Sequence, residues 1–323
     1  MKISMKIKLG IIMDPIFSIN IKKDSSFSIL LEAQKRKYSI YYMETLDLYL
    51  KNNKPFSKAK LLLLKNNKKK WFFFKEQKNI SLLDLDVILM RKDPPVDEQY
   101  MYVTYILEQA ESHGVLIINK PGSLRDFNEK LSTMWFPEFI PYTLVTSNIS
   151  QIYNFVNKHK DIIIKPLNGM GGLSIFRIKK NDPNTMVIIE TMTDYGKKLC
   201  ISQIYIPDIK YGDKRILIIN GKPFPWCLAR IPKINENRGN LASGGLGKVQ
   251  KLTLCDWNIA NNIAPVLKNK GLYFVGIDII GNKLTEINVT SPTCIQEIEF
   301  KCKISISNII LNFIEQHLIT KTI

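Results

Sequence analysis

Asp278, Glu286 and Asn288 lie among apolar residues in the segment GIDIIGNKLTEINVTSPT, residues 276–293. The alternation in EINV has the period of two that is typical of a β-strand, so Glu286 and Asn288 share a face. A Gly-Asn pair before them indicates a turn that returns Asp278 on an antiparallel neighbour. A three-residue loop would set Asp278 opposite Glu286 on that face, whereas a two-residue loop would put them on opposite faces.

Oxygen-bearing side chains crowded on one surface repel each other unless a positive charge lies between them. Magnesium takes hard oxygen ligands, usually carboxylates together with nucleotide phosphates. We therefore expect Asp278, Glu286 and Asn288 to bind Mg²⁺ or Mn²⁺. The alternative is a partly buried salt-bridge cluster that these residues form with Arg215 or Lys165.

A lysine at the end of an apolar strand precedes a glycine-rich turn in IIIKPLNGMGG. The free backbone N–H groups of such a turn suit a phosphate, so Lys165 with Gly169, Gly171 and Gly172 forms a candidate phosphate site. The segment lacks the GxxxxGK[ST] pattern of a Walker loop, and a flexible β-turn is the alternative. Lys130, in NEKL, precedes another strand and by itself would be a solvated helix residue.

Arginine within an apolar strand is costly unless it is paired with an anion. Arg215 in DKRIL and Arg230 in CLARIP are both of this kind, and they indicate a carboxylate or phosphoryl pocket. A structural ion pair with Asp213 or Asp278 is the alternative for each of them. Residues 235–247, NENRGNLASGGLG, have the composition of a lid that orders over substrate, or of a disordered surface loop.

The chain has 323 residues and a formal net charge of +17, which raises the possibility of a basic nucleic-acid-binding protein. The excess is mainly lysine in Asn- and Ile-rich stretches, and no nucleic-acid-binding motif accompanies it. The sequence contains five cysteines without CxxC spacing and three histidines, none of which is near a cysteine. Thiol catalysis and a zinc site are therefore not expected. No apolar run approaches the ~20 residues of a membrane helix, so we expect a cytoplasmic protein with free thiols.

Strand-like and helix-like segments alternate over the first part of the chain. KLGIIMD, SIYYME, LDVILM and VLIIN are predicted strands, and helices are predicted over SSFSILLEAQKRK, starting on a Ser cap, and YMYVTYILEQAESHG. The lysine-rich passage from about 50 to 80 reads as a hairpin or loop excursion. This order predicts an α/β open parallel sheet whose strand ends bring Asp14, Arg91 and Asn119 to one functional edge. After about 200, β-type segments dominate.

Taken in order, Lys130, Lys165 with GMGG, and the segments SQIYIP, DKR, ARIP, RGNLASGG, GIDIIG and EINVTSPT resemble ATP-grasp ligases. The match to the bacterial glutathione synthetases is closer still, because RKDPP and the amino-terminal segments extend it over nearly the whole chain. The resemblance implies a Rossmann-like, open parallel-sheet substrate domain over 1–125. A two-part α+β ATP-grasp fold would follow, with a lid domain over 126–202 and a catalytic domain over 203–323.

The resemblance also implies an activity: ATP- and Mg-dependent ligation of γ-glutamylcysteine with glycine through an acylphosphate, giving glutathione, ADP and phosphate. The alternative within the superfamily is another carboxylate–amine ligase. The resemblance to the glutathione synthetases implies a homotetramer as well. The residues that it assigns to the nucleotide are Lys130, Lys165, Gly169, Gly171, Gly172, Gln203, Ile204, Tyr205, Ile206 and Asp213. Those that it assigns to catalysis are Arg215, Arg230 and Arg238, and those for the dipeptide are Asp24, Ser25, Arg91, Ser291 and Thr293.

Overall fold

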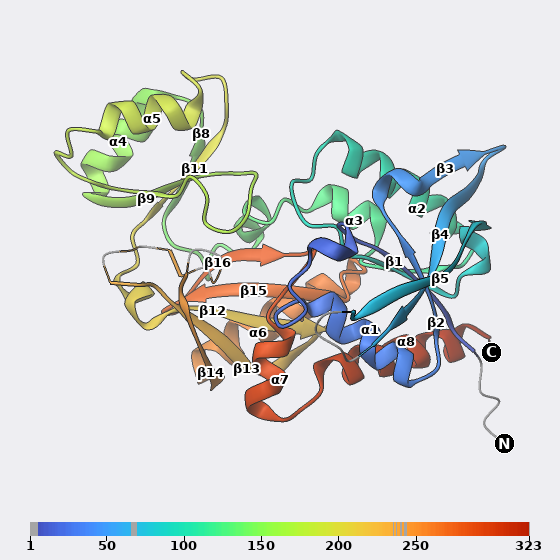
Figure 1. The fold of residues 1–323 in the computed structure, drawn as a ribbon. Coiled ribbons are helices and arrows are strands. Elements are labelled where there is room, and N and C mark those ends of the chain that lie inside the picture. The colour runs from blue at the N-terminus through green and yellow to red at the C-terminus, as the bar shows by residue number, and fades with distance from the viewer. Residues whose placement is uncertain are drawn as a thin grey trace.

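The computed structural model describes residues 6–65, 70–234, 236, 238–239, 241 and 244–322. Three β-sheets follow one another along the chain (Figure 1). No described helix has the length and apolar character needed to span a membrane.

The first sheet has seven strands and is mixed rather than wholly parallel, which corrects the sequence-based expectation. Strands β2, β1, β6 and β7 form its parallel part, as predicted. The lysine-rich passage forms the antiparallel β4–β5 hairpin, and β4 joins the sheet beside β2. The strands are β1 (Lys8–Ile12), β2 (Ser39–Met43), β3 (Leu48–Lys51), β4 (Lys54–Leu64), β5 (Phe72–Ser81), β6 (Val87–Met90) and β7 (Leu116–Ile118).

Helices α1 (Ser25–Lys35), α2 (Glu98–Ser112) and α3 (Pro121–Asp126) connect these strands or follow them. The N-cap of α1 is Asp24 rather than Ser25: the Asp24 carboxylate accepts a hydrogen bond of 2.6 Å from the Phe27 N–H. Sequence alone could not separate the two, because both residue types are good N-caps.

The carboxyl ends of the parallel strands meet at one edge, as predicted. Lys92 Nζ lies 2.7 Å from Asp14 Oδ1, and the Asp93 N–H donates to Asp14 Oδ2 at 3.0 Å. Asn119, after β7, reaches the third sheet, where its Nδ2 donates to the carbonyls of Phe274 and Val289. This edge therefore faces the strands that carry the candidate site.

The second sheet is antiparallel, in the order β10-β9-β11-β8, and two helices pack against it (Figure 1). Its small apolar cluster includes Ile152, Ile162, Ile178 and Ile189 and takes residues only from this part of the chain. The elements are β8 (Thr143–Thr146), α4 (Ile149–His159), β9 (Asp161–Pro166), β10 (Phe176–Lys179), α5 (Thr185–Thr193) and β11 (Cys200–Ile204).

The third sheet is also antiparallel, in the order β14-β13-β12-β15-β16. Its strands are β12 (Asp213–Ile219), β13 (Lys222–Ile231), β14 (Leu246–Lys251), β15 (Phe274–Ile280) and β16 (Lys283–Asn288). The helices of this region are α6 (Leu254–Asn269), α7 (Ile295–Cys302) and α8 (Ile306–Thr322).

The first and third sheets share their cores. One apolar cluster contains Ile12 together with Ile277, and another contains Leu30 together with Ile314. Helix α8 packs on α1, and Tyr38 donates to Glu315 at 2.9 Å across this contact. The two parts therefore form one body, from which the second sheet and its helices project (Figure 1).

Candidate active site

Asp278 and Glu286 are paired across β15 and β16, as one of the two predicted registers requires. The connecting turn has only two residues, Gly281 and Asn282, which alone would separate the two acids onto opposite faces. A β-bulge at Thr285 adds one residue to β16 and restores their pairing. The predicted juxtaposition is confirmed, but the bulge produces it rather than a three-residue loop.

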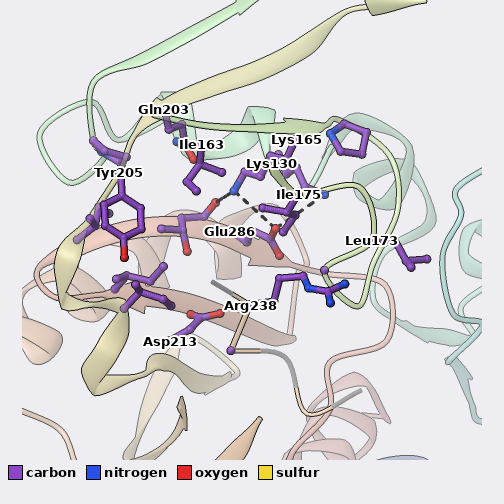
Figure 2. Close-up of a pocket in the computed structure, with 18 of the residues that line it drawn as sticks. Lys130, Ile163, Lys165, Leu173, Ile175, Gln203, Tyr205, Asp213, Arg238 and Glu286 are labelled. Atoms are coloured by element: carbon purple, nitrogen blue, oxygen red, sulfur yellow. Dashed lines mark hydrogen bonds and ion pairs between the residues drawn. The ribbon is translucent and has the colours of Figure 1, made fainter. Parts of the chain in front are cut away.

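Two buried lysines converge on the Glu286 carboxylate. The Nζ atoms of Lys130 and Lys165 each lie 3.8 Å from Glu286 Oε1, and Figure 2 shows both side chains directed at it. Lys130 Nζ also donates to the Gly169 carbonyl at 3.1 Å. Burial lowers the pKa of Lys165, the nearby Lys130 ammonium lowers it further, and Glu286 opposes both. This corner therefore holds concentrated positive charge beside the glycine turn, where an anion would be stabilised.

Arg215 and Arg230 both bind Asp278, as their ion-pair alternative predicted. Arg215 Nη2 and Arg230 Nη2 each lie 2.8 Å from Asp278 Oδ2, and Arg215 Nε bonds Oδ1. Burial alone would raise the pKa of Asp278, but the two guanidinium groups outweigh burial and hold it below its ordinary value. Arg230 also pairs with Asp213, whose pKa burial raises to about 6. The carboxylates and arginines form one buried network.

The residues proposed for a metal fit a hard cation in part. Asn288 donates its Nδ2 to the Gly276 carbonyl and to Asp278, which leaves its Oδ1 as an acceptor. Glu286 has no partners beyond the two lysines among the described residues. The oxygens of Asp278 already accept from arginine, so a cation would depend mainly on Glu286 and Asn288. Consistent with this, no three described His, Cys, Asp or Glu side chains gather as a metal site.

A cavity lies between the second and third sheets (Figure 2). All ten residues assigned to the nucleotide from sequence line it, and so does Arg238. Apolar side chains, including Ile163 and Ile175, form its walls, and Asp213 lies across the cavity from the Tyr205 ring.

The ring of Tyr205 is fixed by a stack that the sequence did not indicate. The Arg177 guanidinium lies 3.4 Å from the centroid of the Tyr205 ring. Two hydrogen bonds of 2.9 and 2.6 Å to Asp161 hold that guanidinium in place. The Tyr205 N–H donates to the Asp161 carbonyl, so the ring and its backbone are both tied to β9.

A second cavity adjoins the first at Glu286 and the glycine turn. Arg215, Arg230 and Asn288 line it, together with Ser291 and Thr293, two of the residues assigned to the dipeptide from the sequence. The cluster of charged groups therefore lies where the two cavities meet. Such an arrangement can bring a phosphate from one side to a carboxylate on the other.

The other residues assigned to the dipeptide do not line this second cavity. Asp24 caps α1, and the Ser25 hydroxyl accepts from the Ile295 N–H at 3.2 Å. Arg91 is buried and donates from Nη2 to the Pro292 carbonyl at 2.8 Å. In this structure Arg91 supports the loop that carries Ser291 and Thr293, Ser25 supports the start of α7, and none of the three residues lines the second cavity.

The predicted lid is described only in part, because residues 235, 237, 240, 242 and 243 lie outside the described residues. Arg238 is described: it pairs with Glu236 at 2.7 Å and borders the first cavity.

Sequence reasoning missed Glu129, which precedes Lys130. Glu129 Oε1 accepts hydrogen bonds from the Val289 N–H at 2.9 Å, the Thr290 N–H at 3.2 Å and the Thr290 hydroxyl at 2.9 Å. Burial raises its pKa, and the bonds from Thr290 oppose that shift. The only signal in the sequence was its position beside a candidate lysine.

Two family models match the chain. The model described as "Prokaryotic glutathione synthetase, N-terminal domain" matches residues 7–125. The model described as "Prokaryotic glutathione synthetase, ATP-grasp domain" matches residues 129–303. Together they take in most of the sequence.

Relatives named glutathione synthetase match over nearly full length. One from Buchnera aphidicola subsp. Baizongia pistaciae is 69% identical over 315 residues, which are 97% of this chain and 97% of the relative. One from Escherichia coli strain K12 is 58% identical over 312 residues, 97% of this chain and 99% of the relative. This level of identity decides against the nucleic-acid-binding alternative.

Solved structures of lower identity share the fold. The ATP-grasp ligase PsnB, complexed with a phosphomimetic variant of its minimal precursor, Mg and ADP, matches with a TM-score of 0.64 at 12% identity. That match covers 97% of this chain and 99% of PsnB. The D-cycloserine synthetase DcsG matches with a TM-score of 0.59 at 11% identity, over 88% of this chain and 92% of DcsG. The fold is therefore that of ATP-grasp proteins, and the chain belongs to the prokaryotic glutathione synthetase family, whose members are ATP-dependent ligases.

Proposed function

We propose that the chain joins γ-glutamylcysteine to glycine with ATP, through an acylphosphate, and releases glutathione, ADP and phosphate. The observation that carries this proposal is the junction at Glu286, where a lysine-lined cavity meets an arginine-lined one. Identities of 58–69% to glutathione synthetases support the choice of substrates.

In this mechanism the first cavity binds ATP. The segment over 203–206, at the end of β11, meets the adenine, and Lys130 and Lys165 neutralise the γ-phosphate next to the glycine turn. Glu286 and Asn288, with a smaller contribution from the arginine-bound Asp278, would hold a magnesium or manganese ion, which would supply further positive charge to the phosphates.

The second cavity binds the dipeptide with its cysteinyl carboxylate toward Glu286. A carboxylate oxygen attacks the γ-phosphorus, ADP leaves, and the amine of glycine then attacks the acylphosphate carbon. Arg215 uses Nε and Nη2 for Asp278, which leaves Nη1 to stabilise the tetrahedral oxyanion. Because Asp278 fixes that guanidinium, the donor is already oriented before the reaction begins.

Phosphate release tests the substrate assignment. We expect rapid, ATP-dependent release with γ-glutamylcysteine and glycine together, and little with either alone or with other carboxylate–amine pairs. Faster turnover of a different pair would instead make the chain another carboxylate–amine ligase. Loss of turnover on chelation of divalent cations, with recovery on adding magnesium, would support the metal requirement.

The Arg177–Tyr205 stack should affect nucleotide binding more than chemistry. Arg177→Ala frees the ring, and we expect the KM for ATP to rise about two- to fivefold with little change in kcat, since a cation–π contact near the surface contributes about 0.5–1 kcal/mol. Steady-state kinetics over a range of ATP concentrations measures both values. Lys179→Ala, an exposed change on the same strand, is the control. An unchanged KM in Arg177→Ala would contradict this role.

We also propose, from the resemblance to the family, a substrate domain over 1–125, a lid over 126–202 and a catalytic domain over 203–323. The separate apolar cluster of the second sheet supports an independent lid, whereas α8 packs on the first domain. A homotetramer in the cytoplasm completes the proposal. The five unpaired cysteines fit a reducing compartment, and sedimentation analysis would test the assembly.

A further inference from the structure

The two carboxylate oxygens of Glu129 have different surroundings. Oε1 accepts all three hydrogen bonds from Val289 and Thr290, and the Glu129 carbonyl also accepts from the Ile287 N–H at 2.8 Å. Oε2 has no partner among the described residues, and Glu129 lines the second cavity. One oxygen therefore anchors the side chain and the other is available to a ligand.

Glu129 also differs from the other acids at the junction in its charge balance. Asp278 and Asp213 are paired with arginines, and Glu286 lies beside two lysines. No described cation pairs with Glu129. Glu129 is partly buried, and holding a carboxylate against the protein without a cation is unfavourable, so the site would gain from a ligand that brings one.

The position of Glu129 points to the reacting end of the cavity. It directly precedes Lys130, whose ammonium lies 3.8 Å from Glu286 at the junction. Asp93, the remaining acid in the lining, stands instead on the loop after β6, close to the charge of Arg91. A cationic group near Glu129 would thus lie beside the acylphosphate, whereas one near Asp93 would lie toward the first sheet.

We propose that Glu129 Oε2 binds the ammonium group of the incoming glycine and takes one proton from it. This inference rests on the proposed function and adds a catalytic residue to it. The freed nitrogen lone pair forms the C–N bond at the acylphosphate carbon, and the C–O bond to phosphate breaks. The second proton that nitrogen loses as the amide forms goes to the departing phosphate.

Glu129→Gln tests the proposal with two nucleophiles. The amide oxygen can occupy the place of Oε1 and keep its three hydrogen bonds, but the side chain can no longer take a proton. Glycine carries an ammonium group at neutral pH, whereas hydroxylamine is already unprotonated and needs no base. We expect the ratio of the glycine rate to the hydroxylamine rate to fall by about 100-fold, the lower range for general-base catalysis.

Glu129→Asp retains a carboxylate and should recover part of that ratio, whereas Glu111→Gln, a partly buried glutamate outside both cavities, should leave it at the wild-type value. An unchanged ratio in Glu129→Gln, whether or not both rates fall, would reduce Glu129 to an anchor for the 289–290 segment. If the ratio of the glycine rate to the hydroxylamine rate were no higher in Glu129→Asp than in Glu129→Gln, the proposal would also be overturned. Failure of the wild type to release phosphate with γ-glutamylcysteine and either nucleophile would instead refute the proposed function.

Discussion

Replacing Lys165 with methionine is expected to lower kcat for phosphate release by about 100- to 1,000-fold, the effect of losing one oriented group that stabilises transition-state charge. Methionine fills a similar volume without the charge, so packing at the end of β9 should be retained. The wild-type ammonium lies in a buried corner with Lys130, where water screens its charge only weakly. Stopped-time phosphate assays at saturating ATP measure the loss.

The matched control is Lys158→Met, which removes an exposed lysine from the last turn of α4 in the same part of the chain. It should leave kcat near the wild-type value. If Lys165→Met retained more than about a tenth of the wild-type kcat, the lysine would have no large part in the chemistry.

Asp278→Asn is expected to lower the free energy of unfolding by about 3–5 kcal/mol, because it leaves two buried guanidinium groups without their shared anion. It should also abolish measurable ligation, since Arg215 loses the group that orients it. Urea denaturation of the ligand-free protein measures the first effect. Glu286→Gln is the comparison: it alters a partly exposed side chain 3.8 Å from its cations, so it should impair turnover with a much smaller loss of stability.

The difference in free energy of unfolding between the wild type and Asp278→Asn should become smaller as the pH falls. The two arginines hold the pKa of Asp278 below its unfolded value, so its contribution is fully present above about pH 4 and is lost as pH falls further. The denaturation midpoints of wild type and Asp278→Asn should therefore approach each other in acid. A constant gap from neutral pH down to pH 2 would show that packing, rather than charge, accounts for the loss.

Much of this architecture could be predicted because local pattern and topology agree. The parallel strands of the first sheet, the helices between them and the β15–β16 hairpin all have strong periodicity, and the ten nucleotide residues line one cavity. The register of the hairpin could not be predicted from loop length alone. The bulge at Thr285 changes which residues face each other, and no residue type in the sequence marks it.

Contacts between distant segments explain the rest of what was missed. Glu129 reads as a solvated residue until the 289–290 segment, far along the chain, donates to it. The stack of Arg177 on Tyr205 likewise depends on how β10 and β11 flank β9. For Arg215 and Arg230, the unfavourable burial of an unpaired guanidinium group in an apolar strand correctly indicated an anionic partner. Only the structure shows that both arginines share Asp278.

The packing of α8 on α1 also bears on how the chain is assembled during synthesis. The second sheet and its helices draw their apolar cluster from one continuous stretch, so this unit can fold as soon as it leaves the ribosome. The amino-terminal sheet emerges earlier, yet the α8 partners of Leu30 and Tyr38, which are Ile314 and Glu315, arrive only when α8 is made. The amino-terminal sheet is thus completed after the segments that follow it, and until then the face that α8 covers is open to chaperones.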